Sequence, residues 1–383
     1  MLMRLIPLAI YLCKIWFDKQ TIDSITSLID QIRNYPDDGT KNMLIESLSK
    51  RITLLSEVPL AKELSDGLTN PDQSPFLSEE VVLSALGSRL FLAFSEVNPE
   101  PCAYALQRMI AKKSDDDILA IELARRNLSW ALDHLAFDKR SFRDAMLTLA
   151  RFSLVETESN LANNTTGLFL DRFKIILPGT EVDLSTRVDL LKELYEKGRY
   201  EPLIKKALLN ALHTGHFYRS GGAEKQGTKV LKDYEPSFSV IATYYNTCFD
   251  MFLSITNTQQ DVEDIAKSLA ENARFYYMQG MEDFLFKGLD SIAPQKEFVW
   301  EEMKDSLSYI LEYDARKRNN HRIEDVLSWR NRLTKDDYVY RLLHLDKEIS
   351  RHYDSSFEEE MKKLHQCYRD IARELVDKEL YKD

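Results

Sequence analysis

The chain has 383 residues, which is enough for a large core or for several domains. An apolar fraction of 44% and a charged fraction of 30% exclude a disordered chain. The formal net charge of -11 argues against bulk binding to nucleic acid or to anionic membranes.

The chain begins with an apolar run from Leu5 to Cys13, behind Arg4. The run superficially resembles a signal peptide, but no small-residue cleavage site follows and Lys14 closes it. It is also too short to cross a bilayer as a helix. We therefore expect a buried helix in a cytoplasmic protein, with a secretion signal as the alternative.

Apolar residues then recur at helical spacing along most of the chain, and glycine and proline are scarce, which predicts an all-α fold. Ser141 is the expected N-cap of one helix, and Asn163 or Thr165 that of the next. The first helices are expected in pairs or singly at 21–32, 41–55, 78–94, 99–111, 115–135, 142–152, 165–177, 184–198 and 203–212.

A helical pair such as 115–152 has about 40 residues, the size of one HEAT-type repeat unit. No residue-level repeat consensus accompanies it. Each hairpin would expose an apolar face that a neighbour can bury. We therefore predict that residues 1–215 form an α-solenoid of stacked helical hairpins (HEAT/ARM-like).

Residues 216–236 interrupt this pattern with a glycine-rich stretch, HFYRSGGAEKQGTKVLKDYEP. Glycine allows unusual backbone conformations and a close approach of a ligand to the main chain. We expect a connecting loop or small hairpin that is part of a recognition surface. Its candidate recognition residues are His216, Arg219, Gly221, Gly222, Glu224, Lys225 and Gln226.

The last region, 237–383, is expected to be a block of longer helices at 238–256, 261–289, 298–313 and 356–381. Aromatic side chains at helical spacing are more often core than cofactor contacts. The final helix is expected to cap the solenoid or to bind a partner helix. The aromatic residues expected in the core are Tyr244, Tyr245, Phe249, Phe252, Phe275, Tyr276, Tyr277, Phe284 and Phe286.

Tests for catalytic and metal motifs give no assignment. Gly222 and Gly227 have the spacing of a Walker A loop, but the next residues, Thr228-Lys229, are in the wrong order and no buried strand precedes them. His213 and His216 are three residues apart without the further ligands that a metal needs. We predict no cofactor, no metal and no catalytic residue, and hence a protein that is not an enzyme.

The chain has one basic cluster, which is interleaved with Trp329. It could bind phosphate or an acidic partner, although pairing with Glu324 and Asp325 on a solvated face is the ordinary explanation. The cluster consists of Arg316, Lys317, Arg318, Arg322, Arg330 and Arg332.

The four cysteines are far apart, without a C-x-x-C pair. This spacing argues against structural zinc and against a disulfide framework. We expect Cys13, Cys102, Cys248 and Cys367 to be buried reduced thiols.

Three segments together resemble the helical C-terminal region of large bacterial P-loop NTPases of the STAND-like type, which are associated with phage defence. The segments are Asn163–Phe169, Leu177-Pro178-Gly179-Thr180, and His216–Gly227 closed by Asp233-Tyr234-Glu235-Pro236. The resemblance covers roughly 115–300 and implies a sensing or scaffolding role. The P-loop domain of that family is absent here, so no catalytic residue carries over.

The leading hypothesis is a non-enzymatic helical-repeat scaffold that recognises a protein partner, either an NTPase subunit or a phage protein. The alternative is a HEAT-like nucleic-acid-binding or DNA-repair protein that uses the basic segment 316–332, which the net charge opposes. A third hypothesis, an ATPase subunit using Gly222–Gly227, fails on the residue order given above.

Overall fold

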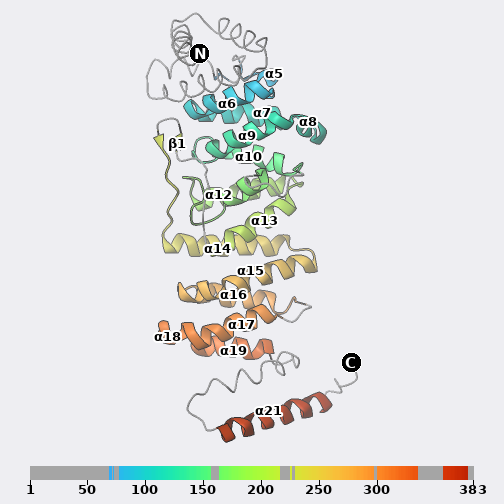
Figure 1. Ribbon diagram of the computed structural model, residues 1–383, viewed down its shortest axis with the longest axis vertical. Helices are drawn as coiled ribbons and strands as arrows, with labels where there is room; N and C mark the ends of the chain where they lie inside the picture. Colours follow the sequence, from blue (N-terminus) through green and yellow to red (C-terminus); the bar gives the residue numbers. More distant parts are fainter. Residues whose placement is uncertain are drawn as a thin grey trace, which may run out of the picture. The chain divides into compact units, whose positions relative to one another are not determined.

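The computed structural model describes residues 69–70, 72, 77–156, 164–215, 225–226, 229–296, 300–334 and 357–377. These residues are mostly helical (Figure 1), with a two-stranded antiparallel pair as the only sheet among them, so the predicted all-α class is confirmed. The N-terminal apolar run and the helices expected at 21–32 and 41–55 lie outside the described residues.

The described residues fall into two compact units. Unit 1 lies within Met1–Ala211 and His216–Phe252, and unit 2 within Leu212–Gly215 and Leu253–Asp383. The predicted division at 216–236 puts all of 238–256 in the second block, whereas 238–252 belongs to unit 1. The helices up to this point are α5 (Glu79–Val82), α6 (Ala85–Val97), α7 (Pro99–Ile110), α8 (Asp115–Leu119), α9 (Glu122–Leu135), α10 (Phe142–Ser153), α11 (Thr165–Asp171), α12 (Leu184–Glu196), α13 (Glu201–Leu212) and α14 (Phe238–Ile255).

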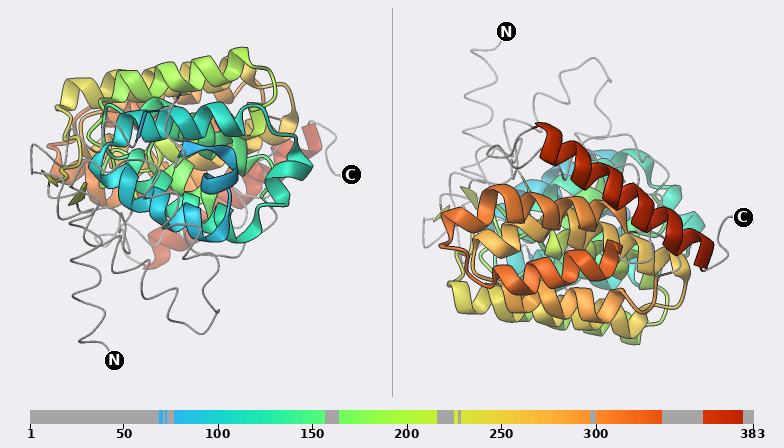
Figure 2. Two further views of the ribbon diagram at one scale, coloured as in Figure 1. Left: turned by 90° about the horizontal axis from the view of Figure 1, so that it is seen from above. Right: turned by 90° about the horizontal axis from the view of Figure 1, so that it is seen from below.

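In unit 1, helix α6 packs against α9, and α10 packs against both α7 and α11 (Figures 1 and 2). Large aromatic side chains fill the spaces between these helices and are almost fully buried. Burial of such rings is the main favourable contribution to the stability of a helical core. The fully buried phenylalanines of this unit are Phe91, Phe94, Phe137, Phe142, Phe152, Phe169, Phe173, Phe249 and Phe252.

Most helices of unit 1 begin with residue types that are common N-caps, but two predicted N-caps need correction. Ser141 occupies the N-cap position of α10, but its hydroxyl makes no cap bond and donates to the Leu135 carbonyl instead. The N-cap of α11 is Asn164, between the two expected residues, and its side chain accepts from the Gly167 N–H. At α8, Ser114 and Asp117 form a reciprocal capping box.

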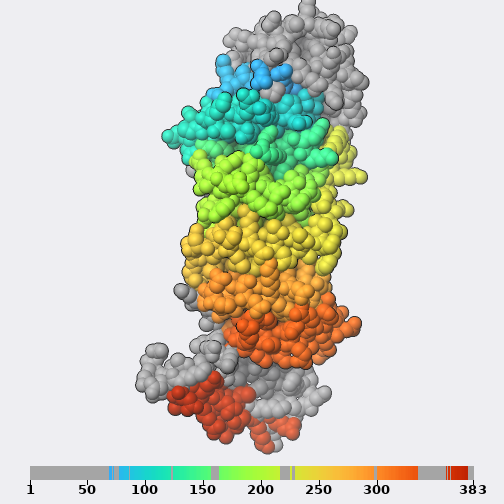
Figure 3. Space-filling view, turned by 180° about the vertical axis from the view of Figure 1, so that it is seen from behind, coloured from blue at the N-terminus to red at the C-terminus, as the bar shows by residue number. Residues whose placement is uncertain are grey.

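The segment 229–237, called here the strap, connects the strand pair to α14. Strands β1 (Lys225–Gln226) and β2 (Lys229–Val230) pair antiparallel. Leu231 is buried against Phe137, and the Lys229 ammonium lies 3.1 Å from the Glu181 carboxylate. Figures 1 and 3 show this yellow segment along the edge of the green helices of unit 1. The strap therefore contacts Phe137 and Glu181, two positions that are far from it in the sequence.

Unit 2 is built around α15, which packs against α16 and α17, and Figure 2 (right) shows these helices in orange. The single helix expected at 261–289 is broken at Gly280, whose φ of 80° ends α15. The helices of unit 2 are α15 (Gln259–Met278), α16 (Glu282–Ile292), α17 (Glu301–Tyr309), the π-helix η2 (Ile310–Asp314), α18 (Ala315–Lys317), α19 (Ile323–Thr334) and α21 (Phe357–Asp377).

The aromatic residues expected in the core are buried, except for the half-buried Phe275. The expectation for the cysteines is correct at Cys102 and Cys248, where burial raises the pKa of each thiol, that of Cys248 to about 12. It is wrong at Cys367, which is exposed on the charged helix α21. Cys13 lies outside the described residues.

Candidate functional site

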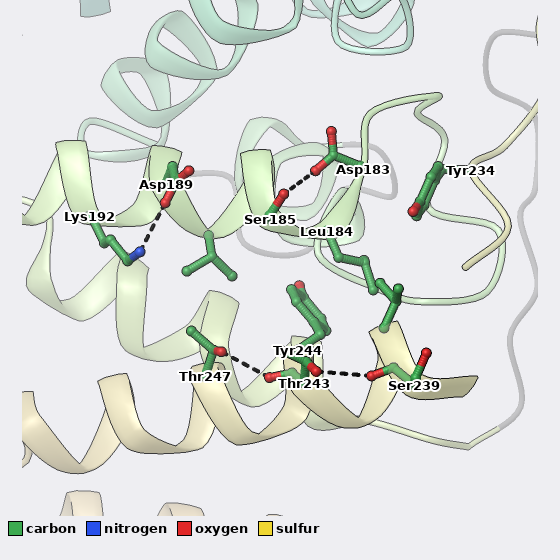
Figure 4. A pocket seen from close by; sticks show the side chains of 12 residues that line it. Asp183, Leu184, Ser185, Asp189, Lys192, Tyr234, Ser239, Thr243, Tyr244 and Thr247 are labelled. Atoms are coloured by element: carbon green, nitrogen blue, oxygen red, sulfur yellow. Dashed lines mark hydrogen bonds and ion pairs between the residues drawn. The ribbon is translucent and has the colours of Figure 1, made fainter. Parts of the chain in front are cut away.

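A cavity of about 600 Å³ lies between α12 and α14 in unit 1, with Tyr234 of the strap at one end (Figure 4). This volume is in the range of ligand-binding pockets. Residues at one-turn intervals on each helix provide its two long walls. The lining residues are Asp183, Leu184, Ser185, Val188, Asp189, Lys192, Tyr234, Ser239, Val240, Thr243, Tyr244 and Thr247.

The polar groups of the α12 wall hold the helix itself. Asp183 is the N-cap of α12 and accepts hydrogen bonds from the Thr186 N–H at 2.9 Å and from the Ser185 hydroxyl. Burial opposes ionisation of Asp183, but these hydrogen bonds outweigh it and hold the pKa of the carboxyl below its usual value. At the other end of this wall, Lys192 and Asp189 form an exposed ion pair at 2.9 Å.

The α14 wall combines bonded hydroxyls with exposed apolar surface. The Thr243 hydroxyl donates to the Ser239 carbonyl at 3.0 Å, and the Thr247 hydroxyl donates to the Thr243 carbonyl at 2.9 Å (Figure 4). These side chains therefore satisfy their hydrogen bonds within their own helix. Val240, with 38% of its surface exposed, adds an apolar contact in this wall.

Two buried side chains, Tyr244 of α14 and Arg187 of α12, hold the helices of the cavity walls in place. The Tyr244 hydroxyl donates to the Phe173 carbonyl at 2.8 Å, and burial raises the pKa of this phenol. Arg187 is 0% exposed, and its guanidinium donates to the carbonyls of Val182 and Lys174. Burial lowers the pKa of Arg187 to about 10. The cavity wall is thus tied to the loop between α11 and α12.

Two segments that the sequence analysis singles out, Leu177–Thr180 and Asp233–Pro236, meet at this loop. The Gly179 N–H donates to the Asp233 carboxylate at 2.7 Å, and the Tyr234 N–H donates to the Thr180 carbonyl at 2.9 Å. Gly179 has a φ of 69°, which favours glycine. The segments Leu177–Thr180 and Asp233–Pro236 therefore meet beside the cavity, which Tyr234 lines, a juxtaposition that helical periodicity could not predict.

The predicted recognition loop is described only in part, because His216, Arg219, Gly221, Gly222 and Glu224 lie outside the described residues. Lys225 pairs with Val230 across the short hairpin. Gln226 is buried, and its side-chain amide donates to the Ser95 carbonyl of α6. The contact of Gln226 therefore anchors the hairpin on unit 1.

The predicted basic patch is in unit 2, and most of its cations have partners. The Lys317 ammonium lies 3.1 Å from the Asp314 carboxylate. Arg318 pairs with the buried Glu282, and Arg322 pairs with Asp283 and Asp325.

The rest of this patch lies on α18 and α19. The Arg332 guanidinium stacks 3.8 Å from the centre of the Trp329 ring. Arg330 is half-buried and Arg316 is exposed. Pairing with carboxylates reduces the positive charge that this segment offers to a phosphate backbone.

Two features are absent from the described part of the chain. It has no group of three or more His, Cys, Asp or Glu side chains placed to hold a metal ion. None of its helices is both long and apolar enough to cross a membrane. No family model, curated protein or solved structure matches the chain.

Proposed function

We propose that the protein is a helical-repeat scaffold, an α-solenoid of stacked hairpins, that binds a helical segment of a protein partner between α12 and α14. The observation that carries this proposal is the cavity of about 600 Å³ with a long wall on each of two helices.

The spacing of the lining residues favours a helical occupant. On α12 the wall is formed near 184, 188 and 192, and on α14 near 239, 243 and 247. Each wall therefore spans about two helical turns, or roughly 12 Å. A groove between two helices is a common docking place for the apolar face of a third helix, which inserts side chains at one-turn intervals.

Most polar groups of the cavity already make hydrogen bonds within the protein, which favours binding of a partner by shape and apolar contact. The Asp183 carboxylate and the hydroxyls of Thr243 and Thr247 make hydrogen bonds within their own helices. Val240 supplies exposed apolar surface, whereas Leu184 and Val188 line the cavity with only 1% and 3% of their surface exposed. A partner helix could therefore bury apolar side chains here without leaving those polar groups unsatisfied.

The resemblance to the helical region of defence-associated NTPases extends this proposal to the class of partner. In that setting the partner is an NTPase subunit or a phage protein. The nucleic-acid alternative stays a prediction, and the ion pairs of Lys317, Arg318 and Arg322 give it less support than the sequence did.

Site-specific photo-crosslinking tests the proposal. A benzoylphenylalanine at position 240, in the α14 wall, is expected to form an adduct with a second polypeptide in the cells that express the protein. The same group at position 376, where an exposed valine lies on α21, is the control. Equal adducts at both positions, or an adduct only between copies of this chain, would contradict the proposal.

A further inference from the structure

A second exposed surface lies in unit 2, where three planar side chains lie against one another. Tyr309 ends α17 and Tyr313 lies in η2, and their ring centres are 4.4 Å apart. The Arg274 guanidinium, from α15, lies 3.6 Å from the centre of the Tyr309 ring. The two tyrosines are 42% and 47% exposed. Large aromatic surface is therefore presented to solvent by a rigid helical scaffold.

The π-helix η2 builds this surface. π-helical turns are rare and frequently occur at functional sites. The last residue of η2, Asp314, is only 1% exposed, and it accepts from the Arg274 guanidinium at 2.8 Å and from the Lys317 ammonium at 3.1 Å. The buried carboxylate thus fixes Arg274 against the tyrosine rings.

The charge that a partner meets at this surface is positive. The side chains of Arg274 and Lys317 are 43% and 60% exposed, and Arg316 beside them is also exposed. Asp314, the carboxylate between them, is buried. These three cations outnumber the two carboxylates of η2, the buried Asp314 and the half-buried Glu312, although the chain as a whole has a net charge of -11.

We propose that the surface formed by Arg274, Tyr309, Tyr313, Arg316 and Lys317, called here the tyrosine–arginine surface, binds an acidic segment of a protein. The carboxylates of that segment pair with the exposed cations, and its aromatic or aliphatic side chains pack on the tyrosine rings.

The composition of the surface favours a protein segment over nucleic acid. Tyrosine and arginine are the residues that most often dominate the binding energy of protein interfaces. A nucleic acid would need a longer row of cations to neutralise successive phosphates, whereas Arg274 and Lys317 share Asp314 here and Arg318 and Arg322 in the adjoining loop pair with Glu282 and Asp283. This inference is independent of the cavity in unit 1.

Fluorescence anisotropy with a labelled peptide tests the inference. The probe is a peptide of about twelve residues, rich in Asp and Glu with one central Trp, at roughly 50 mM salt, where surface charges are weakly screened. We expect binding that weakens as salt is added. The double variant Tyr309→Ala, Tyr313→Ala is expected to lose about tenfold or more in affinity.

Tyr104→Ala is the matched control, because Tyr104 is 44% exposed in unit 1 and also lies beneath an arginine, Arg108, at 5.3 Å. It should leave peptide binding unchanged, and thermal unfolding will show whether each variant is folded. Three results would overturn the inference: no peptide binding, equal binding by the folded double variant, or tighter binding of a labelled oligothymidylate of similar length.

Discussion

Two arginines of unit 1 and two of unit 2 have opposite roles. In unit 1, Arg172 and Arg187 are 3% and 0% exposed, and they bond to backbone carbonyls of the loop between α11 and α12. In unit 2, Arg274 and Arg322 lie at the surface, where they pair with carboxylates and stack on aromatic rings. Arg172 and Arg187 thus hold the interior of unit 1 together, whereas Arg274 and Arg322 lie on the surface of unit 2.

The cost of burial explains why this difference matters. A guanidinium loses much solvation free energy when it leaves water, and it is tolerated only where hydrogen bonds replace that solvation. Arg187 meets this condition through the carbonyls of Val182 and Lys174. A surface ion pair changes its solvation little and contributes little to stability.

The largest expected effect is at Arg187. Replacing it in Arg187→Met leaves the carbonyls of Val182 and Lys174 buried without their donors. We expect a loss of roughly 3 to 5 kcal/mol in the free energy of unfolding, measured with urea. Arg143→Ala, which breaks an exposed pair with Glu193, should cost less than about 1 kcal/mol. Similar losses in the two variants would refute the contrast between interior and surface arginines.

A smaller loss of stability is expected at Gly179, which packs against the buried guanidinium of Arg172. Gly179 and Gly198 have positive φ angles of 69° and 75°. A Cβ at position 179 would lie 2.5 Å from Arg172 Nη1, whereas one at position 198 would meet nothing within 4 Å. Gly198→Ala should therefore cost about 1 kcal/mol and Gly179→Ala about 2 to 3 kcal/mol. Equal thermal shifts would show that Arg172 yields freely.

The smallest effect is expected in unit 2, which buries a cation of a different kind. Lys304 is 0% exposed, and burial lowers its pKa to about 8. Below this pH the folded protein must hold the ammonium charged, so Lys304→Met should raise the free energy of unfolding by roughly 1 to 2 kcal/mol at pH 7.

The pH dependence gives this prediction its sign. Between pH 8 and about 10 the unfolded chain binds more protons at Lys304 than the folded chain, so the stability of the parent protein rises with pH there. The advantage of Lys304→Met should shrink over that window in urea titrations. An advantage that does not change with pH would contradict this explanation.

Helical periodicity predicts much of the described fold because it depends on residues three and four apart. The predicted helix 142–152 is observed as α10, and 238–256 as α14. The breaks near Ala120 and Gly280 were missed, because the apolar stripe continues on both sides of each turn.

The candidate site could be predicted only in part. Tyr234 and Thr180 are joined by a hydrogen bond between segments far apart in sequence, which local patterns do not encode. Arg187 did have a signal, since it lies on the apolar stripe of α12 with Leu184 and Leu191. A single arginine on an apolar helix face indicates a buried side chain that donates hydrogen bonds to nearby carbonyls. The sequence instead drew attention to the basic cluster, whose charges are mostly paired at the surface.

Hydrogen–deuterium exchange with the partner identified by crosslinking tests the central claim most directly. We predict slower exchange in both 184–192 and 239–247 when that partner is added, because a helix between α12 and α14 would stabilise both walls. Protection confined to 309–317, or absent from either wall, would contradict the account.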